Sequence, residues 1–142
     1  MPHQVSVFAE NKPGKLNRIT EILSKNNINI RAITISDTGD YGIIKLLIDK
    51  PVEGNEHLLN AGIASTLVSI VAIIIDDTPG GLHKATSLLS SKNINVEDAY
   101  GFTIREKNQA VFVFQVDDVN LTEKILRDAD FTIISDNELY YL

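Results

Sequence analysis

The sequence has 142 residues, 44% of them hydrophobic, no cysteine and a mean hydropathy of +0.02. This composition predicts a soluble globular protein without disulfides or thiolate metal sites. Because neither a transmembrane run nor a signal-peptide pattern is present, we expect it in the cytoplasm. The net charge of −6 arises entirely in residues 67–142, which carry twelve acidic and six basic side chains. An acidic chain without a basic stripe disfavours binding to nucleic acid or to anionic membranes, since both depend on neutralising phosphates.

A turn motif occurs twice in the chain, 66 residues apart. In each copy a polar residue precedes Pro-Gly, and a helical pattern of apolar residues then begins. Such a turn can hold a carboxylate or a phosphate, because the first-turn amides of a helix have no partner within the helix. The repeat predicts two small domains, residues 1–68 and 69–142. The two copies of the motif are Asn11-Lys12-Pro13-Gly14-Lys15-Leu16 and Asp77-Thr78-Pro79-Gly80-Gly81-Leu82.

The other predicted elements follow the same order in both copies. A strand precedes each turn, at residues 4–9 and 70–75, and the helix after the turn ends at an Asn-Ile-Asn segment that begins at Asn27 or Asn93. Two strands joined by a polar turn come next, then a helix, which Gly54 weakens in the first copy, and then a final strand. These elements are predicted at residues 30–36, 41–48, 52–60 and 63–67, and at residues 96–105, 109–116, 120–128 and 131–134. Residues 136–142 have no predicted structure.

The order strand, helix, strand, strand, helix, strand predicts an α+β fold of two ferredoxin-like βαββαβ units. Right-handed crossovers place the strands of each unit antiparallel in the order 4-1-3-2, with both helices on one face. The other face carries Ile43, Leu47, Val111 and Val113, which are more apolar than a bare sheet face requires. We therefore expect a homodimer that covers this face, and we expect each half to depend on the other for stability.

This pattern resembles the ACT domain, a small-molecule regulatory module attached to many enzymes of amino-acid metabolism. The resemblance rests on the two turns and the two Asn-Ile-Asn segments, and it covers nearly the whole chain. It implies a stand-alone protein of two ACT-like units side by side in one eight-stranded antiparallel sheet. It also implies an amino-acid effector bound where the units meet. We expect a separate metabolic enzyme or regulator as partner, and we expect no catalytic residues, metal or cofactor.

The resemblance also implies ligand-binding positions in the turn, in the first turn of the helix and at the start of the second strand of a neighbouring unit. The 18-residue spacing from Asn11 to Asn29 predicts that both reach the same helix N-terminus. Serine is not the expected ligand, because Ala9 stands where some serine-binding relatives carry His. The implied positions are Asn11, Gly14, Lys15, Leu16 and Asn29 in the first copy and Asp77, Gly80, Gly81, Leu82 and Asn95 in the second.

Two other interpretations remain open. A small ferredoxin-like enzyme would share the fold, and a structural dimerising subunit would have the same turns without a ligand. The three histidines do not recur between the copies and lack metal-ligand spacing, and adjacent carboxylates such as those of Asp76 and Asp77 project in different directions. Because no nucleophile with a base, metal cluster or cofactor motif supports the enzyme, an amino-acid sensor is the preferred interpretation. Neither its ligand nor its partner follows from the sequence.

Overall fold

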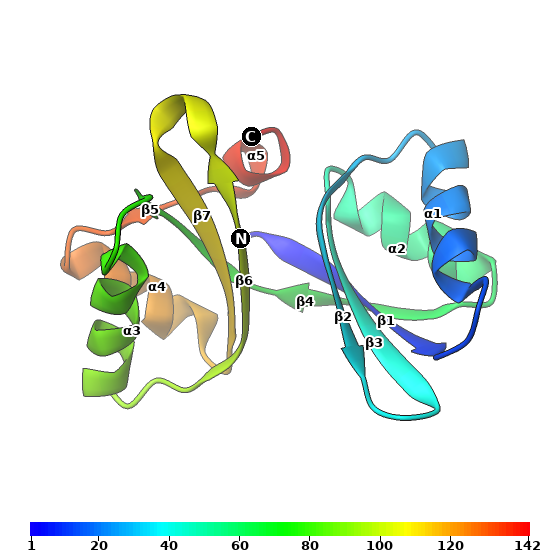
Figure 1. Cartoon of the computed structure of the whole chain (residues 1–142), viewed down its shortest axis with the longest axis horizontal. Coiled ribbons are helices and arrows are strands. Elements are labelled where there is room, and N and C mark those ends of the chain that lie inside the picture. The colour runs from blue at the N-terminus through cyan, green and yellow to red at the C-terminus, as the bar shows by residue number, and fades with distance from the viewer. The chain divides into compact units, whose positions relative to one another are not determined.

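Four strands and two long helices occur in the same order in each half of the computed structural model, which describes residues 1–142 (Figure 1). The first half contains β1 (His3–Glu10), α1 (Lys15–Lys25), β2 (Ile30–Asp37), β3 (Tyr41–Ile48), α2 (Pro51–Asn60) and β4 (Ala64–Ser69). The second half contains β5 (Val71–Asp76), α3 (Gly81–Ser91), β6 (Val96–Ile104), a 3₁₀ turn η1 (Arg105–Lys107), β7 (Gln109–Val116), α4 (Val119–Asp128), β8 (Thr132–Ile133) and α5 (Asp136–Tyr140). None of the helices is long and apolar enough to cross a membrane.

The chain divides into two compact units. The first unit consists of His3–Val68 together with Tyr141, and the second consists of Ser69–Tyr140 together with residues 1, 2 and 142. The backbone N–H of Ile70 donates to the carbonyl of Pro2 at 3.0 Å, which ties the beginning of the chain to the second unit. Neither unit is therefore made from one continuous segment.

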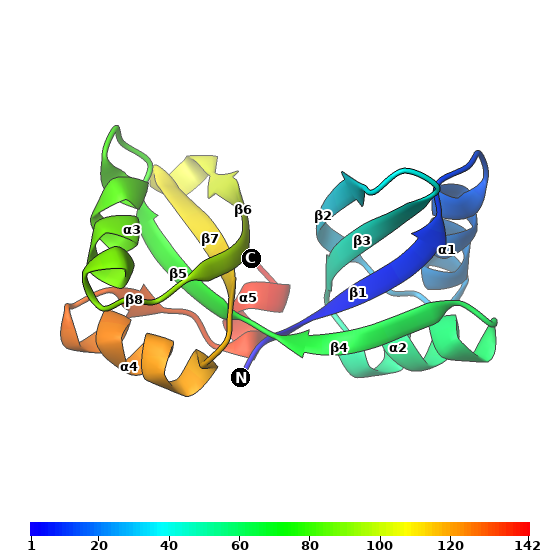
Figure 2. The ribbon, with the colours of Figure 1, turned by 90° about the horizontal axis from the view of Figure 1, so that it is seen from below.

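Each unit has its own four-stranded sheet, ordered β2-β3-β1-β4 in the first and β6-β7-β5-β8 in the second (Figures 1 and 2). This confirms the predicted strand order and the two ferredoxin-like units. The single eight-stranded sheet is not formed, because no strand of one sheet pairs with a strand of the other. A continuous sheet needs a ladder of backbone hydrogen bonds between two edge strands, and every ladder here lies within one unit.

Both long helices of each unit pack on the same face of its sheet. Side chains alternate across a strand, so every second residue of the two central strands faces the helices. Burial of one such aliphatic side chain contributes roughly 1.5–3 kcal/mol, and these small cores are near the minimum for units of this size. The first core contains Val5, Val7, Ile19, Leu23, Ile28, Ile44, Leu46, Ile48 and Leu58. The second core contains Val71, Ile73, Ala85, Leu89, Phe114, Val116, Val119 and Leu126.

The helices that follow the two turns end at asparagines in the left-handed conformation. The φ angle is +55° at Asn27 and +57° at Asn93. The amide after Asn27 donates to the carbonyl of Leu23 at 2.9 Å, and the amide after Asn93 makes the same bond to Leu89. These bonds satisfy carbonyls that would otherwise lack a partner at a helix end. The prediction from the Asn-Ile-Asn segments is confirmed.

The sheet face away from the helices is more enclosed than the sequence suggests. Leu47, Val111 and Val113 are fully buried within the chain and Ile43 is half-buried, so the four form no exposed patch for a second chain. This corrects the reason given above for a homodimer. In the second unit, α5 lies on that face, across the sheet from α3 and α4, and buries Leu139 and Tyr140 (Figures 1 and 2).

Candidate functional site

The two Pro-Gly turns have the same backbone shape. Gly14 and Gly80 adopt the left-handed conformation immediately before α1 and α3, with φ of +90° and +84°. A Cβ at either position would meet no atom within 4 Å, so the conformation, and not a lack of space, requires glycine. Neither helix has a side-chain cap, and the amides of Leu16 and Leu82 have no acceptor. The Leu16 side chain is exposed, whereas that of Leu82 packs against the second core.

The polar residue that opens each turn differs between the copies. The Asn11 side chain donates to the Asp37 carboxylate at 2.9 Å and to the Gly39 carbonyl at 3.2 Å. It therefore ties the first turn to the hairpin between β2 and β3, while its own amide oxygen accepts no hydrogen bond. Asp77 is held only through its backbone amide, which donates to the Asn108 carbonyl at 3.0 Å. The Asp77 carboxylate is consequently available, whereas Asn11 is partly committed to the fold.

The asparagines at the start of the second strand lie at the far end of each unit from the turn. In the first unit the turn follows β1 beside Tyr41, the first residue of β3, whereas Asn29 precedes β2 beside Ile48, the last residue of β3. The eight residues of β3 span roughly 23 Å at about 3.3 Å per residue. The expectation that Asn11 and Asn29 reach the same helix N-terminus is therefore wrong within one unit. Asn95 has the equivalent position in the second unit.

A pocket lies beside each turn. In the first unit it opens between the end of β1, the first turns of α1 and the connection from α2 to β4, with a volume of about 370 Å³. In the second unit the equivalent pocket lies between β5, α3 and the connection from α4 to β8, with a volume of about 380 Å³. Ten of the eleven lining residues correspond, at an offset of 66 before the hairpin and 68 after it. Volumes of this size suit small ligands.

The first pocket is lined by two cations and one carboxylate. Lys15 and Arg18 belong to α1, and neither makes an ion pair. Glu10, at the end of β1, is paired with Lys12 at 2.8 Å, and the hydrogen bond and charge of Lys12 lower the pKa of the Glu10 carboxyl. The charge of Lys15 also lowers this pKa, so two lysines act on the Glu10 carboxylate and the pocket lining keeps a net positive charge.

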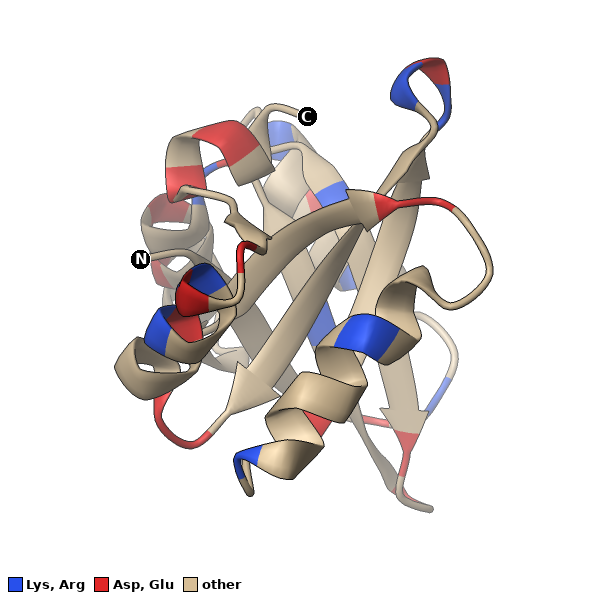
Figure 3. Ribbon diagram, turned by 90° about the vertical axis from the view of Figure 1, so that its left-hand side faces the viewer, with Lys and Arg blue, Asp and Glu red and all other residues tan.

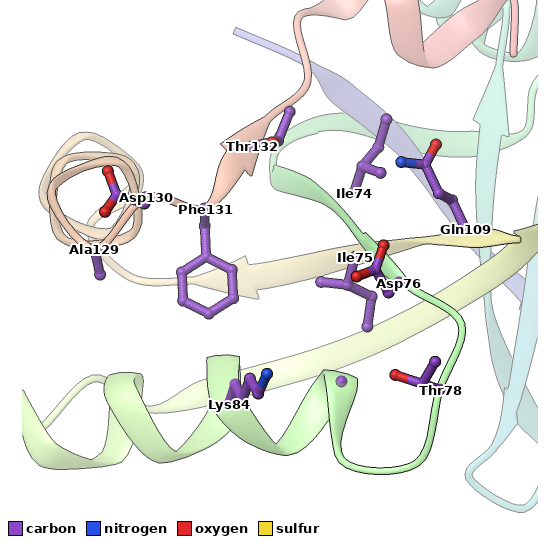
Figure 4. A pocket seen from close by; sticks show the side chains of 11 residues that line it. Ile74, Ile75, Asp76, Thr78, Lys84, Gln109, Ala129, Asp130, Phe131 and Thr132 are labelled. Carbon is purple, nitrogen blue, oxygen red and sulfur yellow. The ribbon is translucent and has the colours of Figure 1, made fainter. Parts of the chain in front are cut away.

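The second pocket is lined by two carboxylates and one cation. Asp76 ends β5, Lys84 belongs to α3, and Asp130 lies in the connection after α4, beside Phe131 (Figure 4). None of the three charged side chains makes an ion pair or a hydrogen bond to another side chain. The lining of this pocket therefore carries a net negative charge, and the further acidic residue Asp77 follows the end of β5 (Figure 3).

Sequence reasoning located the turns but missed most of the pocket lining. Of the residues implied by the resemblance, only Lys15 and Gly81 line the pockets. The connections after α2 and α4 come close to the turns only in the folded unit, so no local pattern reveals them. The charged lining residues did carry a signal, because an acid and a base recur at an offset of 66, as Glu10 with Asp76 and Arg18 with Lys84. No group of three or more His, Asp or Glu side chains is placed to hold a metal ion.

Comparison with known proteins identifies the family. The family model of the ACT domain pair matches residues 1–142. A crystal structure of a protein from Bacteroides thetaiotaomicron superposes with a TM-score of 0.93 at 29% sequence identity, over 99% of this chain and 96% of that chain. The ligand-free regulatory subunit of aspartate kinase from Thermus thermophilus shares the fold, with a TM-score of 0.66 at 18% identity over 90% of each chain. The corresponding subunit from Thermus flavus gives 0.63 at 17% identity, again over 90% of each chain.

No match was found among curated proteins. The family match nevertheless spans the whole chain, and the duplicated turn, the strand order of both units and the left-handed asparagines agree with it. The chain belongs to the ACT domain pair family.

Proposed function

We propose that the protein is a non-catalytic, cytoplasmic regulator that binds amino acids in its two equivalent pockets. The observation that carries this proposal is that both units place a carboxylate and a cation around the same pocket, beside helix amides that have no acceptor. A free amino acid needs both signs of charge, since its carboxylate requires donors and its ammonium requires acceptors. Both pockets provide both signs of charge, as such a ligand requires.

A regulatory role is supported by the family and by the fold. Structures that share the fold include regulatory subunits of aspartate kinase. We infer that ligand binding changes how this chain engages a separate metabolic enzyme or regulator. The cytoplasmic location rests on composition alone.

The positions implied by the family resemblance have different parts in this proposal. Lys15 and Gly81 belong to the pocket walls, and the amides of Leu16 and Leu82 provide donors for a carboxylate. The turn glycines Gly14 and Gly80 shape the approach to those amides, and the free oxygens of Asn11 and Asp77 suit an ammonium. Asn29 and Asn95 contribute only where a neighbouring unit brings them to a turn. A homodimer, which we also propose, would supply such a unit.

The proposal is tested by a thermal-shift screen of the full chain against the twenty amino acids, followed by calorimetry of the best ligands. A ligand at a hundred times its dissociation constant should add about 2.7 kcal/mol of stability. Arg18→Gln and Lys84→Gln should each weaken binding in one unit. Lys92→Gln is the matched control, because Lys92 is exposed at the opposite end of α3 from the pocket. The proposal is wrong if no amino acid raises the melting temperature.

A further inference from the structure

The two pockets have the same place in the fold but opposite charge. We propose that the first pocket selects amino acids with an acidic side chain and that the second selects amino acids with a basic side chain. This inference rests on the proposed function and deepens it, because it assigns a different ligand class to each unit.

The first pocket complements a ligand with two carboxylates and one ammonium. Lys15 and Arg18 are three residues apart on α1, so they lie on the same face of the helix and both border the pocket. Glu10 is the only carboxylate in the lining, and Lys12 already neutralises it at 2.8 Å. The two remaining cations match the α-carboxylate and the side-chain carboxylate of an acidic amino acid.

The second pocket complements a ligand with one carboxylate and two cationic groups. Lys84 is the only cation in the lining. Asp76 makes no ion pair, and Thr78 stands where the first unit has Lys12. Asp130 adds a second carboxylate (Figure 4). The two unpaired carboxylates match the α-ammonium and the side-chain cation of a basic amino acid.

Backbone geometry explains why the two pockets differ. Gly81 stands where the first unit has Lys15, and a Cβ there would lie 2.6 Å from the carbonyl oxygen of Asp76. The second pocket therefore has no room for a cationic side chain at that position. At Asp130 φ is +66°, and at the equivalent Gly62 it is +80°. Glycine and aspartate are both tolerated in this conformation, so this connection keeps its shape whether or not it carries the carboxylate.

The inference is tested by calorimetry of the full chain with L-glutamate and L-lysine, using L-glutamine and L-norleucine as neutral analogues of similar size. Each charged ligand should bind one site per chain, and saturation with one should not block the other. The affinity of each neutral analogue should be at least about fivefold lower than that of the charged ligand, because the analogue loses a solvent-accessible charge pair. The preference for the charged ligands should shrink as salt is raised.

Two reciprocal variants assign each ligand to its pocket. Asp130→Gly should weaken lysine binding about fivefold and leave glutamate binding unchanged. Gly62→Asp should weaken glutamate binding by a similar factor and leave lysine binding unchanged. Each variant introduces the residue found at the other unit's equivalent position, so both should fold, which an unchanged melting temperature verifies.

Equal affinity for each charged ligand and its neutral analogue would overturn the charge assignment, as would loss of both ligands in either variant. One neutral amino acid that fills two sites per chain would also overturn it and would leave the proposed function standing. Absence of binding by all twenty amino acids would overturn both the charge assignment and the proposed function.

Discussion

Asn11 and Asp77 illustrate how equivalent positions acquire different roles. Asn11 donates two hydrogen bonds to the hairpin between β2 and β3, whereas the Asp77 side chain makes none. We predict that Asn11→Ala destabilises the protein by about 1 kcal/mol, the usual net contribution of a hydrogen bond. Asp77→Ala, the matched control, should change stability by less than about 0.5 kcal/mol. Urea unfolding compares the two variants, and equal midpoints would contradict the prediction.

Tyr100 should make the stability of the protein sensitive to alkaline pH. Burial raises the pKa of the Tyr100 phenol above its ordinary value, and the nearby charges of Asp98 and Tyr140 raise it further. Because the folded state holds the proton more tightly, this group's stabilising contribution is complete below about pH 10 and is lost as the pH rises above it.

We therefore predict that Tyr100→Phe reduces the fall in stability between about pH 9 and pH 11. The measurement is the urea midpoint as a function of pH. Tyr141→Phe, which removes the phenol of an exposed tyrosine, serves as the control. An identical slope in wild type and Tyr100→Phe would show that this phenol does not govern alkaline stability.

Single residues were predictable where the cause is local. A Pro-Gly pair indicates a glycine with positive φ, and the Asn-Ile-Asn segments indicate left-handed asparagines, as observed at Gly14 and Asn27. The partners of Asn11 were not predictable, because Asp37 lies 26 residues further along the chain and approaches only when the sheet forms.

At the scale of the elements, Gly54 shows why a poor helix former stands inside α2. It is buried, and a Cβ there would overlap the end of the Ile48 side chain and contact Leu23 at 3.5 Å. Glycine therefore allows α2 to pack closely on β3, although it lowers helix propensity.

We predict that Gly54→Ala destabilises the protein by about 1 kcal/mol. Overpacking costs typically 1–3 kcal/mol, whereas the gain in helix propensity is at most about 1 kcal/mol. Glu56→Ala, at an exposed position of the same helix, is the control for propensity alone. Thermal unfolding distinguishes the two effects, and a rise in melting temperature for Gly54→Ala would contradict close packing.

The long helices and strands were predicted correctly from the periodicity of apolar residues, but the short elements were not. The helices predicted at residues 52–60 and 120–128 begin one residue earlier, at Pro51 and Val119. α5 was missed because five residues are too few to show a helical period. β8 is shorter than predicted, since only Thr132 and Ile133 pair with β5.

For the whole molecule, we predict that residues 1–68 and 69–142 do not fold as independent monomers. The two cores are small, residues 1 and 2 belong to the second unit, and Tyr141 belongs to the first. Separately expressed halves should give poorly dispersed NMR spectra, and mixing them should restore dispersion. Dispersed spectra from both isolated halves as monomers would refute this prediction.

We also predict a homodimer, now on the basis of exposed apolar side chains in the first unit. The rings of Phe8 and Tyr41 are stacked 5.0 Å apart although their exposed fractions are 54% and 46%, and Ile35 is 56% exposed. Closed two-fold dimers are the commonest way to cover such groups. Light scattering should give twice the chain mass, and Phe8→Ser should shift the equilibrium towards monomer. A monomer throughout the micromolar range would exclude the dimer.

The place of residues 1 and 2 in the second unit has a consequence for biosynthesis. Ile70 donates to the carbonyl of Pro2, yet it leaves the ribosome 68 residues later. At roughly 5–20 residues per second this delay is about 3–14 s, whereas hairpins form in microseconds. The first sheet can thus assemble on the ribosome while residues 1 and 2 have no partner. The second unit, which includes the beginning of the chain, can therefore be completed only after β5 has emerged, and residues 1 and 2 stay accessible to chaperones during that interval.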